Sequence, residues 1–307
     1  MGPPSLVILF TVIVLLYMVY RWLRLPPFPV GRCRQFVERS RAGPIAHRAG
    51  RPENTLAGIR RAEQEGAPGV EVDLAFTKDS VAVLLHDKTV DRTSNGSGKL
   101  SELTFEEVRK LNFGNDSTSE SIPTLEEALR LCEELDLQVY LEVKRGHDKA
   151  VAAIADCLRR SPALYRLVVV VSFCPLALYK MRAADPNINC GMILIGTKFV
   201  LQSKGFQESV WTATFALCCD WTLRWCVRNW LLGFLGVNML LPQKEMVLNN
   251  ALGSGSYWEG RGVSLVTWTV NKREEKKIMK SELKIAFLSD SVNPDLTAPE
   301  QFELHKH

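Results

Sequence analysis

The chain has 307 residues, of which 46% are hydrophobic and 23% are charged, and its formal net charge is +4. These proportions are those of an ordinary globular protein, so they exclude disorder of the whole chain. The small positive charge comes without any block of basic residues, and this excludes nucleic acid as the expected partner.

The first predicted element is an apolar helix near the N-terminus. The run from Ser5 to Tyr20 carries no charge, and a helix needs about 20 apolar residues to span a bilayer. A cleaved signal peptide has basic residues before its apolar run and a small-residue site after it, and this segment has neither. We therefore expect residues 1–24 to form an uncleaved, single-pass transmembrane anchor, followed by a linker over residues 25–42.

The sequence leaves open which side of the membrane the rest of the chain occupies. Four arginines follow the apolar run, and the positive-inside rule places such a flank in the cytosol. Two glycosylation sequons, at Asn95 and Asn115, instead suit a lumenal or extracellular domain. We predict an integral membrane protein of the plasma membrane or an endomembrane. The four arginines are Arg21, Arg24, Arg32 and Arg34.

From residue 43 onward, strand-like runs alternate with helical patterns, which is typical of a parallel sheet covered on both faces. Residues 43–297 are enough for eight βα units, so we predict an α/β fold of the (β/α)8 TIM-barrel type with a short tail over 298–307. The predicted strands cover residues 44–47, 70–76, 81–86, 138–144, 167–173, 190–195, 237–241, 263–271 and 285–289, and the predicted helices cover 55–65, 124–134, 149–160 and 175–184.

The first candidate site residues follow the first predicted strand. This strand ends at His47 and Arg48, a glycine turn follows, and a helix begins after Pro52 with Asn54 or Thr55 as its cap. In a TIM barrel the carboxyl ends of the strands form the mouth where active sites are built. The planar fork of donors on Arg48 suits a phosphate there. The competing interpretation is a surface histidine and arginine beside a turn.

Acidic side chains recur on two apolar strands. Because side chains alternate in a strand, Glu71 and Asp73 share one face, and Glu142 and Lys144 share the corresponding face of a later strand. Carboxylates buried together repel one another, and a divalent cation with oxygen ligands relieves that repulsion. We predict a metal site made by the three acids, with Lys144 holding a phosphate oxygen. The alternative is that the acids pair with core arginine or lysine.

A long apolar segment interrupts the pattern as an insert at about residues 200–235. Hydropathy alone favours a second membrane span over residues 211–241. Asp220, Arg224 and Arg228 nevertheless follow one another at four-residue spacing and form a polar stripe along a helix. We therefore expect an interfacial amphipathic helix near the active-site mouth that contacts membrane lipid.

Three further residues complete the predicted site. His86 ends a strand, where a lone histidine is more often structural, but beside His47 it becomes a candidate for acid–base chemistry. Trp268 either walls a substrate pocket or is a plain core aromatic residue. Asp290 follows the last predicted strand, as a helix cap or as a ligand of substrate hydroxyls.

Taken together, these motifs resemble the glycerophosphodiester phosphodiesterase family. They are an HRAG…PENT start at His47, an E-x-D strand, a strand ending in HD, an E-x-K strand, a W-T-V-N strand and a final S-D, in this order over about residues 43–292. One departure is Ala49, where the family usually has glycine, and Gly50 is expected to supply the turn one position later.

The resemblance implies a barrel like that of the phosphoinositide phosphodiesterases, with Mg²⁺, or Ca²⁺ or Mn²⁺, held by the predicted acidic site. It implies hydrolysis of a small glycerophosphodiester to sn-glycerol 3-phosphate and an alcohol. The expected substrates are glycerophosphoinositol and other glycerophospho-alcohols, including glycerophospho-N-acylethanolamines. The alternatives are a lysophospholipase D or phospholipase acting on lipid-bearing substrates and, in another class, a catalytically inactive membrane scaffold.

The resemblance also implies roles for single residues. His47 and His86 act as the acid–base pair, through a cyclic glycerol phosphate in one version of the mechanism, and we favour His47 as the base. Arg48 and Lys144 stabilise the charge on phosphate. The remaining candidates for substrate binding are Asn54, Trp268 and Asp290.

Overall fold

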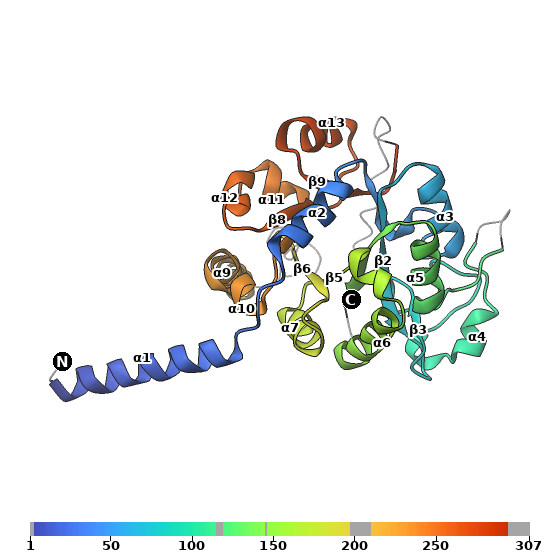
Figure 1. Cartoon of the computed structure of the whole chain (residues 1–307). Helices are drawn as coiled ribbons and strands as arrows, with labels where there is room; N and C mark the ends of the chain where they lie inside the picture. Colours follow the sequence, from blue (N-terminus) through green and yellow to red (C-terminus); the bar gives the residue numbers. More distant parts are fainter. Residues whose placement is uncertain (1–2, 115–118, 145, 197–209, 294–307) are drawn as a thin grey trace.

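The computed structural model describes residues 3–114, 119–144, 146–196 and 210–293 (Figure 1). Three predicted features lie wholly or partly outside these residues. They are the tail over 298–307, the sequon at Asn115 and the first part of the insert, 200–209.

Eight parallel strands close into a barrel, which confirms the predicted fold. Each strand pairs with the next, and β1 pairs with both β2 and β9, so that the sheet has no open parallel edge. The barrel strands are β1 (Ile45–Ala46), β2 (Gly69–Phe76), β4 (Gln138–Val143), β5 (Val168–Ser172), β6 (Asn189–Leu194), β7 (Met239–Pro242), β8 (Ser264–Thr267) and β9 (Ala286–Ser289).

The predicted strand at 81–86 forms, as β3 (Ala82–Leu84), but it does not join the barrel. It pairs with β2 in the antiparallel direction, with Leu84 opposite Leu74. The connection from β2 to β3 is a short turn, whereas a parallel neighbour needs a crossover of a dozen or more residues. The residues after β3 therefore reach the barrel mouth from a hairpin beside β2.

Helices surround the barrel (Figure 1). Thr55, rather than Asn54, caps α3 (Leu56–Gln64) by accepting a hydrogen bond from the Gly58 amide at 3.0 Å. Thr104 and Thr124 form capping boxes at the starts of α4 (Phe105–Arg109) and α5 (Leu125–Glu134). The longer helices are α3 (Leu56–Gln64), α5 (Leu125–Glu134), α6 (His147–Arg160) and α7 (Pro175–Ala184). The shorter ones are η1 (His47–Ala49), η2 (Leu100–Glu102), α4 (Phe105–Arg109), η3 (Pro162–Arg166), α11 (Lys244–Leu248), α12 (Gly255–Glu259), α13 (Arg273–Lys277) and η6 (Ile278–Leu283).

A further helix, α2 (Val30–Ser40), closes the end of the barrel opposite its mouth, within the segment that the sequence analysis treats as a linker. The Phe36 ring meets the Tyr140 ring edge-on at 5.4 Å between centroids. The Ser40 hydroxyl lies 2.7 Å from the Tyr140 hydroxyl, and the Gln138 amide donates to the Phe36 carbonyl at 2.8 Å. Because Gln138 and Tyr140 lie at the start of β4, these contacts seal the amino end of the strands and leave the carboxyl end for the site.

Residues 3–23 form α1 (Pro3–Leu23), which extends away from the barrel (Figure 1). Among the helices that the structure describes, none has both the length and the apolar character needed to cross a bilayer. The predicted transmembrane anchor, and the integral-membrane localisation based on it, are therefore wrong.

The insert contains α9 (Val210–Cys226), η5 (Val227–Leu231) and α10 (Leu232–Leu235). The predicted polar stripe is present, since Arg224 forms an ion pair with Asp220, and both side chains are mostly covered. The aromatic side of α9 is the exposed one, with the Trp211 side chain 84% accessible. Farther along, Leu231 and Leu235 pack into the main hydrophobic core and attach the insert to the barrel.

Candidate active site

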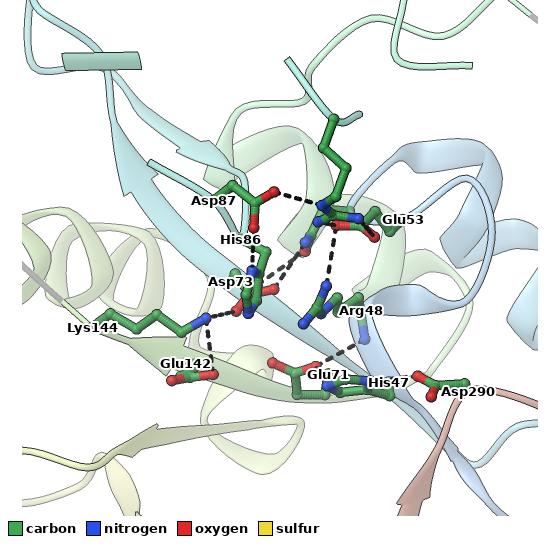
Figure 2. A network of polar contacts seen from close by, with 12 residues as sticks. His47, Arg48, Glu53, Glu71, Asp73, His86, Asp87, Glu142, Lys144 and Asp290 are labelled. Carbon is green, nitrogen blue, oxygen red and sulfur yellow. Dashed lines mark hydrogen bonds and ion pairs between the residues drawn. The ribbon is translucent and has the colours of Figure 1, made fainter. Parts of the chain in front are cut away.

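Three acidic side chains converge at the mouth of the barrel, as the alternation of β2 and β4 predicts (Figure 2). Asp73 and Glu142 lie side by side in the parallel register, and Glu71 is two residues earlier on β2. A carboxylate oxygen from each of the three lies within 4.8 Å of the others, and all three side chains are buried. The alternate residues Val70, Val72 and Leu74 pack outward into the main core.

The electrostatics of this cluster favour a bound cation. Burial and then repulsion from Asp73 raise the pKa of Glu71 to about 8. Burial also raises the pKa of Glu142 to about 7, although Lys144 opposes the shift. One oxygen of Glu142, Oε1, is buried without a hydrogen-bond partner among the described residues. An oxygen-only set of buried, mutually repelling ligands fits a hard divalent ion such as Mg²⁺.

Asp73 differs from the other two acids because both of its carboxylate oxygens accept hydrogen bonds from side chains. The Lys144 ammonium donates to its Oδ1 at 2.7 Å and lies 3.5 Å from Glu142 Oε2. The Asn54 amide donates to Asp73 Oδ2 at 2.9 Å and accepts from the Asp73 amide at 3.0 Å. Burial would raise the pKa of Asp73, but the charges of Lys144, His86 and Arg48 hold it well below its usual value. Asn54, expected to bind substrate, thus orients an acid of the cluster.

His47 lies directly after β1, and Asp290 holds its ring. Its Nδ1 is 2.6 Å from Asp290 Oδ1, and its Nε2 is 3.8 Å from Glu71 Oε2. Burial opposes protonation, but the Asp290 hydrogen bond and the Glu71 charge outweigh it and raise the pKa of His47. Asn271 in turn donates to Asp290 Oδ2 at 2.6 Å. Asp290 therefore orients a histidine in this structure instead of capping a helix, and Asn271, the last residue of the W-T-V-N motif, supports it.

His86 occupies the loop after β3, with a different environment. Its Nδ1 is 2.6 Å from Asp87 Oδ1. Burial lowers the pKa of His86, although Asp73 and the Asp87 hydrogen bond oppose the shift. The two imidazoles thus have pKa values shifted in opposite directions, so they can hold different protonation states at one pH, as an acid–base pair requires.

Arg48 lies beside the acidic cluster in an unusual backbone conformation. Its amide donates to Glu71 Oε2 at 2.8 Å, and its guanidinium lies 3.6 Å from Glu53. Arg48, Ala49 and Gly50 all have positive φ. Gly50, with φ 76° and ψ −130°, adopts a conformation that is essentially restricted to glycine, in line with the expected shift of the turn from Ala49. The Arg48 Nε is buried with no partner among the described residues, so a donor remains for a phosphate.

Trp268 lies just after β8 at the mouth and is half-buried. Its indole N–H donates to the Leu241 carbonyl at 2.9 Å, and its ring meets Phe173 edge-on at 5.7 Å. Phe173 follows β5 and is partly exposed, so the two rings form one aromatic wall. Phe173 has no signal in the sequence, because an aromatic residue at the end of an apolar strand does not by itself indicate a binding site.

A cavity of about 240 Å³ opens beside His47 and Asp290. Three arginines line it, namely Arg48, Arg51 and Arg92. Two acids, Glu53 and Asp290, line it as well, so its lining is strongly polar and suits a polar ligand.

Comparisons with known proteins agree with this geometry. The sequence model of the glycerophosphoryl diester phosphodiesterase family matches residues 46–217. Glycerophosphodiester phosphodiesterase 1 of Bos taurus is 38% identical over 294 residues, covering 92% of this chain and 88% of the relative. The human protein of the same name is 37% identical over 292 residues, covering 91% and 87%.

Solved structures share the fold at lower identity. A putative glycerophosphoryl diester phosphodiesterase from Silicibacter pomeroyi aligns with a TM-score of 0.64 and 19% identity, covering 82% of this chain and 92% of that one. An Oleispira antarctica phosphodiesterase, solved with its product sn-glycerol-3-phosphate, aligns with a TM-score of 0.62 and 23% identity, covering 82% and 94%.

Proposed function

The chain belongs to the glycerophosphoryl diester phosphodiesterase family and hydrolyses glycerophosphodiesters, and we propose that it does so with a divalent cation, Mg²⁺ before Ca²⁺ or Mn²⁺, held by Glu71, Asp73 and Glu142. The observation that carries this proposal is the meeting of three buried carboxylates within 4.8 Å, one oxygen of which has no partner among the described residues. When bound, the cation supplies polarisation of the phosphoryl group and neutralises charge on it.

The surrounding side chains account for the rest of the chemistry. Arg48, with its unpartnered Nε, and Lys144, with its ammonium at the cluster, hold the phosphate oxygens. One of His47 and His86 takes the proton of the attacking hydroxyl, which belongs to water or to the glycerol of the substrate. The other gives a proton to the oxygen that leaves phosphorus. The P–O bond to the head group breaks, and the alcohol leaves. If water attacks, glycerol 3-phosphate is the other product. If the glycerol hydroxyl attacks, a cyclic glycerol phosphate forms first, and water then opens it to glycerol 3-phosphate.

For the head group we propose a small polar alcohol, with glycerophosphoinositol as the first substrate and other glycerophospho-alcohols after it. Glycerophospho-N-acylethanolamines, whose alcohol carries an acyl chain, come last. The support is the cavity of about 240 Å³ beside His47, because its charged lining suits a polar head group better than an acyl chain. A relative from Oleispira antarctica is named as a complex with sn-glycerol-3-phosphate, which is the product this reaction would release.

We also propose that membrane lipid contacts the exposed face of α9. Trp211, Phe215 and Trp221 are all highly exposed there, and aromatic rings are favoured at a membrane surface. Co-sedimentation with vesicles of anionic and zwitterionic lipid tests this contact. Replacing the three aromatic residues with serine should abolish binding, whereas unchanged binding would exclude this face.

The catalytic proposal is tested by measuring glycerol 3-phosphate release from a panel of glycerophosphodiesters and lysophospholipids. After chelation, activity should be lost and then return with Mg²⁺. His47→Ala and His86→Ala should each lower kcat by about 10²–10⁴-fold. Full activity in chelator would exclude the metal role, and near-normal turnover by either alanine variant would exclude that histidine. Release of lysophosphatidic acid from the lysophospholipids as the main product would identify a lipid-directed enzyme.

A further inference from the structure

We propose that Arg92 is a positioning residue for the acid–base chemistry: it holds Asp87, and Asp87 holds the ring of His86. The inference rests on the proposed function of His86 and goes beyond it, since it assigns a role to a residue that does not contact the substrate.

The contacts form a continuous chain from the loop after β3, which carries His86, to the loop after β1, which carries Glu53 (Figure 2). Asp87 uses one oxygen for His86 Nδ1 at 2.6 Å and the other for Arg92 Nε at 2.6 Å. The remaining guanidinium nitrogens of Arg92 donate to the two oxygens of Glu53 at 2.7 and 2.6 Å. A bidentate arginine–carboxylate pair fixes orientation as well as distance. The ring of His86 is therefore held at Nδ1.

This arrangement argues against a simpler role for Arg92, in which it binds the phosphate of the substrate. Arg92 lines the cavity beside His47, as a phosphate ligand would. Each of its three nitrogens nevertheless already donates to a carboxylate, and two acids balance its single charge. Arg48 lines the same cavity with a buried Nε that has no partner among the described residues, so Arg48 is the better phosphate ligand.

The position of His86 in the fold explains why it needs such support. The three acids lie on barrel strands and His47 directly follows one, so the closed sheet fixes them. His86 instead follows β3, which lies outside the barrel and pairs only with β2 among the described strands. The Leu85 amide donates to the Asp73 carbonyl at 2.9 Å, so the backbone just before His86 is tied to β2. The contacts of Asp87 and Arg92 add a restraint on the His86 ring itself.

Glu53 links this restraint to the phosphate end of the site. It lies on the loop after β1 and accepts hydrogen bonds from Nη1 and Nη2 of Arg92. It also lies 3.6 Å from Nη1 of Arg48. The loop that carries Arg48 and the loop that carries His86 are thus joined through one carboxylate. A substrate phosphate bound at Arg48 and the imidazole at His86 would keep a fixed separation, which in-line displacement requires.

The test uses Arg92→Met and Arg92→Lys in the full chain, with kcat and KM measured separately. We expect Arg92→Met to lower kcat by about 10–100-fold with KM changed by less than about threefold, because a misplaced catalytic group slows the chemical step. Arg92→Lys should have a kcat close to that of Arg92→Met, since an ammonium cannot hold Glu53 and Asp87 together as a guanidinium does. Guanidinium ion added to Arg92→Ala should partly restore kcat, which a loss of folding would not allow.

A matched control is Arg109→Met. Arg109 forms a bidentate pair with Glu127, at 2.7 and 2.9 Å, away from the site. Its loss should lower stability to a similar degree without changing kcat. If Arg92→Met does not fold, Asp87→Asn, which keeps the shape of the side chain, should show the same loss of kcat.

The decisive comparison is made in the His86→Ala background. If Arg92 acts through His86, the double variant His86→Ala/Arg92→Met should have nearly the same activity as His86→Ala alone. An equal loss in both backgrounds, a rise in KM alone, or normal kcat in folded Arg92→Met would each overturn the inference while leaving His86 catalytic. Near-normal turnover of His86→Ala by itself would instead overturn the proposed function.

Discussion

His47 and Asp290 lie 243 residues apart in the chain, and their side chains meet with Nδ1 of the histidine 2.6 Å from an oxygen of the aspartate. The register of the first and last barrel strands brings them together, because Ala46 lies opposite Ser289 in the β1–β9 pair. His47 directly follows Ala46, and Asp290 directly follows Ser289, so the strand pairing places the two side chains next to each other. Closing the barrel therefore assembles a histidine–aspartate unit from the two ends of the domain.

Asp290→Asn should lower kcat by about 10–100-fold with the fold intact. The amide keeps the size of the side chain but removes the charge that orients His47 and stabilises its protonated form. Steady-state kinetics with a glycerophosphodiester check this, with circular dichroism as the control for folding. Asn271→Ala, which removes one donor to Asp290, should have a smaller effect in the same direction. Unchanged kcat in Asp290→Asn would show that the pair is only structural.

Glu142→Gln should abolish tight Mg²⁺ binding, because it removes one of three anionic oxygens from the cluster. Isothermal titration with Mg²⁺ measures this directly, without any activity readout. Glu134→Gln, on the exposed side of α5, is the matched control and should bind Mg²⁺ like the parent protein. Equal Mg²⁺ affinity in both variants would show that the ion binds elsewhere.

Mg²⁺ binding should strengthen as pH rises from about 6 to about 9 and should release protons. The pKa of Glu71 is raised to about 8 and that of Glu142 to about 7, so near neutral pH a proton competes with the metal at these oxygens. Titration in buffers of different ionisation enthalpy measures the protons released. A Mg²⁺ affinity that does not change with pH across this range would contradict competition between protons and the metal.

Without metal, the same two groups should make the protein less stable as pH rises. Their pKa values are higher in the folded chain than the ordinary value of 4.5. The folded state therefore binds more protons than the unfolded state between that value and about 8, so this contribution to the free energy of unfolding falls across the window. Urea unfolding in chelator, compared between the parent protein and Glu71→Gln, isolates the effect. The variant should lose less stability over the window, and Mg²⁺ should reduce the loss in the parent.

Gly58→Ala should destabilise the protein by about 1–3 kcal/mol. A Cβ at this position of α3 would lie 2.4 Å from the Pro52 carbonyl and 2.9 Å from the Ala49 carbonyl, both in the loop after His47 and Arg48. The loop would have to move, so kcat should fall as well. Gly31→Ala in α2 meets no atom within 4 Å and should instead stabilise the helix by about 0.5–1 kcal/mol. Urea denaturation of both variants measures the free energy of unfolding, which should fall in Gly58→Ala and rise in Gly31→Ala.

Local patterns were sufficient to predict the barrel and the acidic cluster. Strand alternation alone places Glu71 and Asp73 on one face, and the structure keeps this face toward the mouth. Capping boxes likewise mark the starts of α4 and α5, because they depend on residues three positions apart. Apolar character at the N-terminus, in contrast, led to the wrong prediction of a membrane span, because none of the helices that the structure describes is both long and apolar enough to cross a bilayer.

The partners of each catalytic candidate were decided by the tertiary structure. Nothing in the sequence indicates that Asn54 would hold Asp73, that Asp290 would hold His47 or that Glu53 would reach Arg92, 39 residues away. Such contacts join loops that are brought together only when parallel strands align their carboxyl ends. The sequence thus determined which side chains face the mouth, because alternation along a strand is local. Barrel closure determined which of them touch, because register between distant strands is set by the packing of the whole domain.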